Sequence, residues 1–180
     1  MPFIDSTYFT GEINISQAAN DTQLALAIPQ YETEILIKLL GYELYSLLMD
    51  DLVSGKPVSE RFIKLVDGDD FTINYNGEEI VSHWDGLRNA GKISFIAYYV
   101  YYNYVERSIT PYYGTGISMA PQGKDWERVS AVNKLCSVWE KCRALYGGYD
   151  QPSAYNYLAN SELFPEWRYT PMLQMNPLGI

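Results

Sequence analysis

Residues 93–105 constrain the fold most strongly, because they read as a helix that is apolar on every side. The stretch Ile-Ser-Phe-Ile-Ala-Tyr-Tyr-Val-Tyr-Tyr-Asn-Tyr-Val contains no charged residue. A helix that is apolar all round must be covered on all sides. It is too short to span a bilayer, which needs about 20 apolar residues. We therefore expect a central helix that is wrapped by the rest of the chain or by neighbouring subunits.

The ends of this central helix are marked by residues with clear local preferences. Asp85 is a good capping residue and Pro111 stops the helical pattern, so we expect the helix to extend over residues 85–107. Gly86 and Gly91 weaken its first turns but let another backbone approach closely. The tyrosines of the helix add a requirement of their own, because each hydroxyl group needs a hydrogen-bond partner or water.

Apolar residues at helical spacing also predict helices before the central one. Asp21 or Thr22 is expected to cap a short helical turn, and Pro29 suits the first turn of a new helix. Gly41 is expected to end that helix. A second helix follows over residues 42–52, and the two form a short antiparallel pair.

Three further helices are expected from the same periodicity. The first covers residues 60–66, with Ser59 as its cap. The second is long and covers residues 125–146, starting at Asp125. The third is short and covers residues 153–160.

Residues 71–82 carry the one clear β signal. Apolar and polar residues alternate up to Asn76-Gly77, which is the preferred dipeptide of a type I′ hairpin turn. That turn pairs Ile73 with Ile80 and Asn74 with Glu79. The sequence therefore predicts a mainly α fold, a small helical bundle around a central aromatic helix, with one β-hairpin and an extended C-terminal tail.

The chain is expected to have three parts. Residues 1–20 form an extended N-terminal arm, residues 21–148 form the helical domain with the hairpin, and residues 149–180 form a short helix and an extended docking tail. Residues 169–180 contain no charge, two prolines and several apolar side chains. An exposed segment of this kind is prone to association, so we expect it to dock on another subunit. Packing against its own domain is the alternative.

Composition narrows the classes of function. The 180 residues fit one domain, and the net charge of -9 argues against a surface that wraps nucleic acid. The same charge is compatible with a negative wall along which DNA slides without binding. The 17 tyrosines indicate an aromatic surface of the kind found at protein interfaces and sugar sites. No apolar targeting run is seen in residues 1–20, so we expect the chain to be used inside a cell.

Candidate catalytic and metal-binding residues are few, and none forms a recognised motif. His83 is the only histidine, and no nucleophile motif accompanies it. Cys136 and Cys142 lie six residues apart on one expected helix, which prevents a disulfide between them and makes a poor zinc site. We predict no catalytic residue, no metal ligand and no cofactor.

Several carboxylates lie close together in the sequence. Asp67, Asp69 and Glu78 occupy three positions of a calcium loop, but Thr72 replaces its essential glycine, so the motif fails. Glu32 and Glu34 are expected to stabilise the start of a helix. A carboxylate pair for glycoside hydrolysis remains open, because sequence spacing does not report distance in space.

The order of these parts resembles one known family. The segments that carry the resemblance are Ile28-Pro29-Gln30-Tyr31-Glu32, Leu39-Leu40-Gly41-Tyr42-Glu43-Leu44-Tyr45, Trp84-Asp85-Gly86-Leu87-Arg88, the aromatic helix, residues 110–116 and the long helix that follows. Over residues 17–146 the chain is similar to head–tail connector (adaptor) proteins of tailed bacteriophages, in particular those of phages of Bacteroidetes-type hosts. The chain departs from them in its long apolar C-terminal tail and its excess of tyrosine.

The resemblance implies a structural virion protein located in the neck and assembled in the host cytoplasm. Such proteins are helical and form homo-oligomeric rings, commonly of twelve copies, between the portal protein and the tail or other neck proteins. DNA passes through the ring without specific binding, and no catalytic residue, membrane or cofactor is involved. The residues expected to contact partners are Tyr112, Tyr113, Ile117, Met119, Trp167, Tyr169, Met172 and Leu173. An aromatic carbohydrate-binding module is the alternative function, followed by a carboxylate-based hydrolase.

Overall fold

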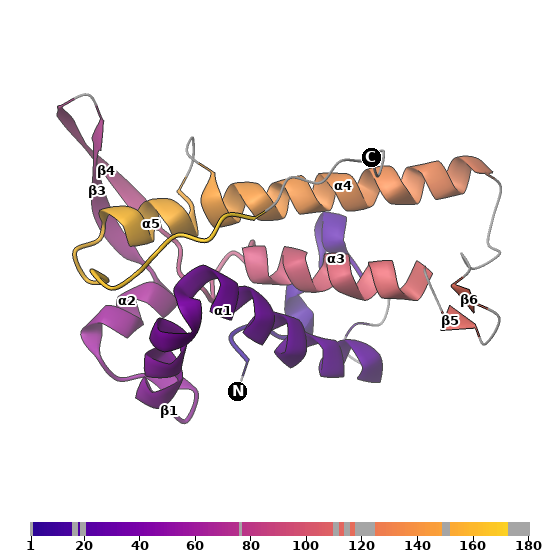
Figure 1. Ribbon diagram of the computed structural model, residues 1–180, viewed down its shortest axis with the longest axis horizontal. Helices are drawn as coiled ribbons and strands as arrows, with labels where there is room; N and C mark the ends of the chain where they lie inside the picture. Colours follow the sequence, from indigo (N-terminus) through magenta and orange to yellow (C-terminus); the bar gives the residue numbers. More distant parts are fainter. Residues whose placement is uncertain are drawn as a thin grey trace.

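The computed structural model describes residues 2–15, 18, 21–75, 77–109, 112–113, 116–117, 125–148 and 152–172. Within these residues the chain is mainly helical, as predicted (Figure 1). Its helices are α1 (Thr22–Asp51), α2 (Glu60–Asp67), α3 (Phe95–Ile109), α4 (Asp125–Gly147) and α5 (Ala154–Asn160).

Helix α3 is the central helix, and it lies between α1 and α4 (Figure 1). Ile96, Ala97 and Val100 are fully buried, and Phe95 is nearly so. The expectation of an aromatic helix covered by the rest of the chain is therefore confirmed.

The predicted start of this helix at Asp85 is wrong. Gly86, Asn89 and Lys92 have φ values of 82°, 32° and 60°, which a right-handed helix does not allow. A Cβ on Gly86 would lie 2.4 Å from the carbonyl oxygen of Val66, so this segment passes directly against another backbone. Residues 85–94 therefore form a tightly packed loop, and α3 begins ten residues later than expected.

Helix α1 joins the two helices that were expected before and after Gly41. Asp21 caps it by accepting hydrogen bonds from the backbone nitrogens of Gln23 and Leu24, at 2.9 and 3.0 Å. The helix passes through Pro29 without ending, so the prediction of a new helix at that proline is wrong. At Gly41 the backbone turns to φ 77° and ψ 159°, which bends the helix where the sequence placed a break.

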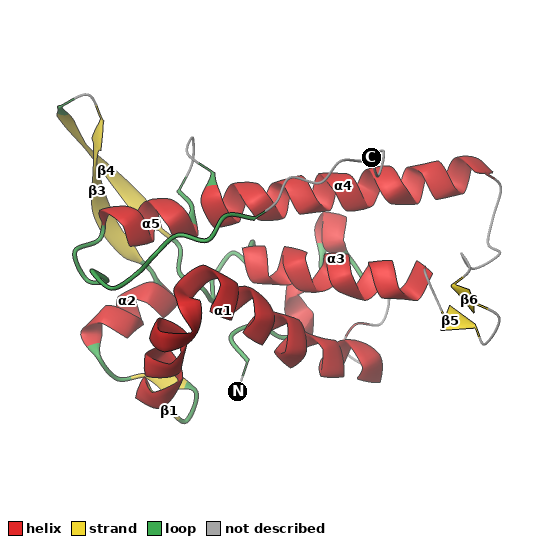
Figure 2. Cartoon of the chain, viewed as in Figure 1, coloured by secondary structure: helices red, strands yellow, loops and turns green. Residues whose placement is uncertain are grey.

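The predicted hairpin is present and somewhat longer than expected. Strands β3 (Asp69–Tyr75) and β4 (Glu78–Trp84) pair with the expected register, in which Ile73 faces Ile80 and Asn74 faces Glu79. Its base is anchored on α5, because Trp84 stacks on Tyr157 with ring centroids 5.7 Å apart. Figure 2 shows the other end of the hairpin projecting beyond the helices.

The prediction of a single hairpin is wrong. Strands β1 (Leu52–Val53) and β2 (Lys56–Pro57) form a second antiparallel pair, and β5 (Tyr112–Tyr113) and β6 (Gly116–Ile117) form a third. Each of these strands has two residues, which is too short for an alternating apolar pattern to appear in the sequence.

Residues 2–15 are not an extended arm. They form two short 3-10 turns, η1 (Ser6–Tyr8) and η2 (Gly11–Ile13), and they contribute Phe3, Ile4, Phe9 and Ile13 to the core. The burial of these apolar side chains makes the segment part of the domain.

The C-terminal residues 161–172 also pack on their own chain. Phe164 is 2 % exposed, and the indole nitrogen of Trp167 donates a hydrogen bond of 2.7 Å to the carbonyl oxygen of Leu39 in α1. Helix α5 begins at the expected place, because the Ser153 side chain accepts a hydrogen bond from the backbone nitrogen of Asn156.

Candidate functional site

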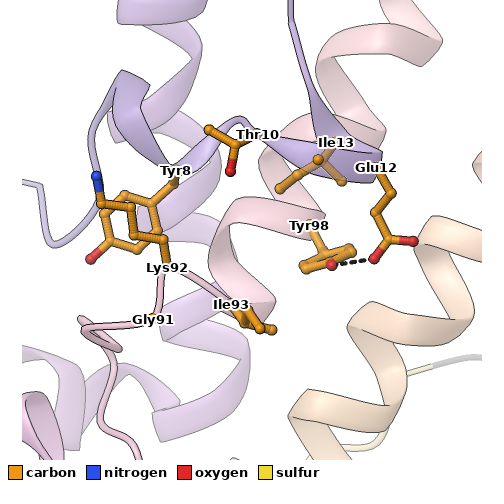
Figure 3. Close-up of a pocket in the computed structure, with 9 residues that line it drawn as sticks. Tyr8, Thr10, Glu12, Ile13, Gly91, Lys92, Ile93 and Tyr98 are labelled. Atoms are coloured by element: carbon orange, nitrogen blue, oxygen red, sulfur yellow. Dashed lines mark hydrogen bonds between the residues drawn. The ribbon is translucent and has the colours of Figure 1, made fainter.

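A hollow of about 260 Å³ lies between the N-terminal 3-10 turns, the loop before α3, and α3 itself (Figure 3). Its lining consists of Tyr8, Thr10, Gly11, Glu12, Ile13, Gly91, Lys92, Ile93 and Tyr98. Ile93 is 51 % exposed and forms part of the apolar lining. The hollow thus combines an apolar wall with charged groups at its edge.

The acidic side of the hollow is already occupied by partners from the same chain. Glu12 accepts a hydrogen bond from the Tyr98 hydroxyl and another from the Lys141 ammonium group, whose nitrogen lies 2.5 Å from Oε1. The bonds from Lys141 and Tyr98 hold the pKa of Glu12 below its usual range, although burial opposes the shift. Among the described residues that line the hollow, Glu12 is the only carboxylate, whereas glycoside hydrolysis uses two.

The hydroxyl groups of three α3 tyrosines donate hydrogen bonds to carboxylates of the N-terminal turns and of α1. Tyr98 donates to Glu12 in η2, Tyr99 donates to Glu34 in α1 at 2.5 Å, and Tyr104 donates to Asp21 at the start of α1. The bond to Asp21 raises the pKa of Tyr104 to about 12, and burial adds to this. These bonds supply the hydroxyl partners that the sequence analysis expected for Tyr98, Tyr99 and Tyr104.

Glu32 has a role that sequence reasoning missed. Its carboxylate is 5 % exposed and accepts hydrogen bonds from the backbone nitrogens of Phe3 and Ile4, at 2.8 and 3.1 Å. Burial raises the pKa of Glu32 to about 7, although the bonds from Phe3 and Ile4 oppose the rise. The predicted role at a helix start is wrong, because the residue lies in the eleventh position of α1. No local pattern could reveal partners that are 28 and 29 residues away.

The other candidate chemical groups lie apart from the hollow. His83 is exposed, and its Nδ1 atom lies 2.6 Å from Asp70 Oδ1 across the hairpin. Cys136 and Cys142 are free, and the buried Cys142 thiol donates a bond of 3.3 Å to the Phe95 carbonyl oxygen. Nowhere in the described part of the chain do three metal-ligating side chains gather, the calcium-loop residues included.

The expected partner-contacting residues fall into two groups. Tyr112 and Tyr113 lie in β5 and Ile117 in β6, but their side chains, together with Met119 and Leu173, lie outside the described residues. Trp167 and Met172 are 8 % and 6 % exposed, and Tyr169 packs its ring 4.5 Å from that of Tyr155. Trp167 and Tyr169 pack against α1, α4 and α5 of their own chain, and Met172 is buried. Docking of this segment on another subunit stays a prediction.

A second candidate surface is the projecting end of the β3–β4 hairpin. Ile80 and Val81 are 49 % and 75 % exposed, and they point to opposite faces because successive residues of a strand alternate. Glu78 and Glu79 lie next to them and are exposed as well. Neither apolar side chain has a place in the core of the domain.

No known family model matches this sequence, and no curated protein or solved structure is recognisably similar to it. Within the described residues, no helix has both the length and the apolar character needed to cross a membrane.

Proposed function

We propose that the chain is a structural subunit of a bacteriophage head–tail connector, which forms a ring between portal and tail. The observation that carries this proposal is the pair of exposed apolar residues, Ile80 and Val81, on the projecting end of an ordered hairpin. Exposed apolar side chains on such a projection favour association with another protein surface. An assembly subunit needs a surface of this kind, and the sequence resemblance points to the same class.

The rest of the domain supports a structural role. Its core is continuous from the N-terminal turns to Met172, and side chains fill the space around α3. The chain is acidic, with a net charge of -9, so a channel built from it would repel rather than retain DNA. Passage of DNA without specific binding is what a connector requires.

The alternatives find less support in the described residues. A carbohydrate-binding module needs several exposed aromatic platforms. Tyr31, Tyr99, Tyr146 and Tyr157 are buried, and among the aromatic side chains whose burial is described only Tyr42 is strongly exposed, at 74 %. A carboxylate hydrolase needs two acids facing a substrate, whereas Glu12 in the hollow is bonded to Lys141 and Tyr98.

Deleting the gene for this chain from the phage that encodes it tests the proposal. A connector is expected to be required for joining heads and tails, so the deletion should leave DNA-filled heads and free tails. Expression of the chain in trans should restore complete particles. Normal infectious particles from the deletion would contradict the proposal.

A further inference from the structure

Strand β4 is an edge strand whose outer side is open. It pairs only with β3, so within the described residues no other strand covers this side. A two-residue hairpin loop is closed by a hydrogen-bonded pair, and alternate pairs along the strands repeat that bonding. The N–H and C=O groups of Ile80 and Ser82 therefore point toward β3. Those of Glu79, Val81 and His83 point outward, and no backbone bond to another described segment uses them.

The open edge has few of the features that keep strand edges from pairing with other chains. Lysine, proline and β-bulges are the usual protection. Residues 78–84 contain no lysine and no proline, and every residue of β4 faces one residue of β3 without a bulge. The hairpin also projects beyond the helices (Figure 2), and Val81 on it is 75 % exposed. Its backbone is therefore available as a template for an added strand.

The hairpin is acidic, and its charge decides which chain can pair there. The two strands contain no lysine or arginine, and their carboxylates belong to Asp69, Asp70, Glu78 and Glu79. His83 also lies between carboxylates, because its Nδ1 atom is 2.6 Å from Asp70 and its Nε2 atom is 3.8 Å from Asp85. Lys64 lies 3.8 Å from Asp69, but it also lies 3.3 Å from Glu60. The edge therefore stays acidic when the neighbouring basic groups are counted.

A second copy of the hairpin is a poor partner for this edge. Two β4 strands side by side would bring the carboxylates of both copies together, and neither hairpin holds a lysine or arginine to offset them. Like charges opposite one another destabilise a strand pair. The side chains of Glu79, Val81 and His83 share one face, because alternate residues of a strand point the same way. A fitting strand therefore presents a basic residue, an apolar residue and a second basic residue on that face.

We propose that the outer edge of β4 binds an extended, basic segment of a partner protein as an added strand. One basic side chain of that segment faces Glu79, the apolar one covers Val81, and the other basic one faces the carboxylates beside His83. The backbone of β4 supplies the hydrogen bonds, and these side chains select the partner. The inference rests on the proposed function, because it names the chemistry of a neighbouring protein that a connector subunit holds through its projecting hairpin.

A synthetic peptide tests this proposal on the full chain. The probe Thr-Lys-Thr-Val-Thr-Lys-Thr, blocked at both ends, places Lys, Val and Lys on one face of a strand. It is titrated into the isotope-labelled chain and followed by NMR. The amide protons of Glu79, Val81 and His83 should become protected from exchange, whereas those of Ile80 and Ser82 are protected already. No added protection of the three outward amides would overturn the proposal.

Two altered peptides separate strand pairing from simple attraction between charges. Replacing both lysines with glutamate should weaken binding about tenfold, because two favourable charge pairs become unfavourable. N-methylation of the valine keeps the charge of the probe but removes its central backbone donor, and this should also weaken binding about tenfold. Equal binding of the N-methylated peptide would show that charge alone attracts the probe, and would overturn the added strand.

Val81→Pro makes the matching change in the protein. Because the N–H group of Val81 points away from β3, proline at this position removes an outward donor and keeps the bonds between β3 and β4. Val81→Thr retains the donor and is the control. The proline variant should bind the probe about tenfold more weakly than the threonine variant, with the amides of Ile80 and Ser82 protected in both. Equal binding by two variants that keep this protection would overturn the proposal.

The outcomes separate this edge from the proposed function and from other occupants. Failure of the probe to bind would overturn the added strand and leave the connector proposal, which the gene deletion tests, standing. Binding of the probe to a chain that phage particles do not need would support the edge and overturn the connector proposal. Self-association of the free chain that Val81→Pro abolishes would identify a second copy as the occupant, and would overturn the basic partner.

Discussion

Glu32 Oε1 lies 2.8 Å from the backbone nitrogen of Phe3, inside the core and far from any helix end. Through this bond and the neighbouring one from Ile4, a carboxylate of α1 fixes the N-terminal segment that forms one wall of the hollow. Replacing it with Glu32→Ala leaves two backbone N–H groups without that acceptor. We expect a loss of about 1–3 kcal/mol in the free energy of unfolding. Denaturant unfolding measures the loss. Glu43→Ala is the control, because Glu43 is exposed on the same helix, and it should change the free energy of unfolding little.

The same carboxyl group predicts a pH dependence of stability. The pKa of Glu32 rises from 4.5 to about 7 on folding, mainly because the group is buried. Between these values the folded state holds a proton that the unfolded state has lost, so this group's contribution to stability falls as pH rises. Glu32→Gln cannot titrate.

We therefore expect the stability of the wild type relative to Glu32→Gln to decline by up to about 3 kcal/mol between pH 4.5 and 7. Unfolding free energies of both proteins across this range measure the decline. A difference in unfolding free energy that stays constant across this range would show that folding does not raise the pKa of Glu32.

Tyrosine ionisation should be suppressed in the folded chain. Burial raises the pKa of Tyr102 to about 12, and the bond to Asp21 raises that of Tyr104 to about 12. Because the unfolded groups ionise near 10.0, the folded state holds more protons above that pH. The stability that these two tyrosines contribute is therefore fully present below pH 10 and is lost as the pH rises toward 12.

Tyrosinate absorbance, recorded together with circular dichroism, checks this expectation. A large part of the absorbance change should coincide with loss of helical signal in alkaline solution. Complete ionisation of all tyrosines near pH 10, with the fold intact, would be inconsistent with the tyrosine–carboxylate pairs.

Two glycines with similar backbone angles should respond differently to alanine. Gly41 and Gly86 have φ values of 77° and 82°, so both substitutions strain the backbone. A Cβ on Gly41 would meet nothing within 4 Å, whereas one on Gly86 would lie 2.4 Å from the Val66 carbonyl oxygen. Gly86→Ala should therefore cost about 1–3 kcal/mol more than Gly41→Ala. Thermal unfolding of the two variants measures the difference, and equal losses would mean that the 85–94 loop can move away from α2.

Local signals in the sequence predicted much of the fold. The structure confirms three expectations that depend only on neighbouring residues. They are the interruption of the helix at Gly41, the capping role of Asp21 and the pairing of Ile73 with Ile80. The loop before α3 was missed because its shape depends on Gly86 packing under Val66, which is a tertiary contact.

The candidate site was harder to predict for the same reason. The hollow is built from Glu12, Lys92 and Tyr98, and segments that are about 80 residues apart meet only in the folded chain. The tail residues Trp167 and Met172 have the apolar character of a docking segment, but apolar character alone does not say which surface covers them. The bond from Trp167 to Leu39 holds the Trp167 side chain on α1 of the same chain, and Met172 is buried.

Imaging of the native phage particle tests the connector proposal most directly. A reconstruction of the neck by electron cryomicroscopy should show a closed ring, expected to contain twelve copies, between the portal and the tail, into which this 20.6 kDa helical domain fits. A neck whose density is fully explained by other proteins, with this chain absent from it, would contradict the account.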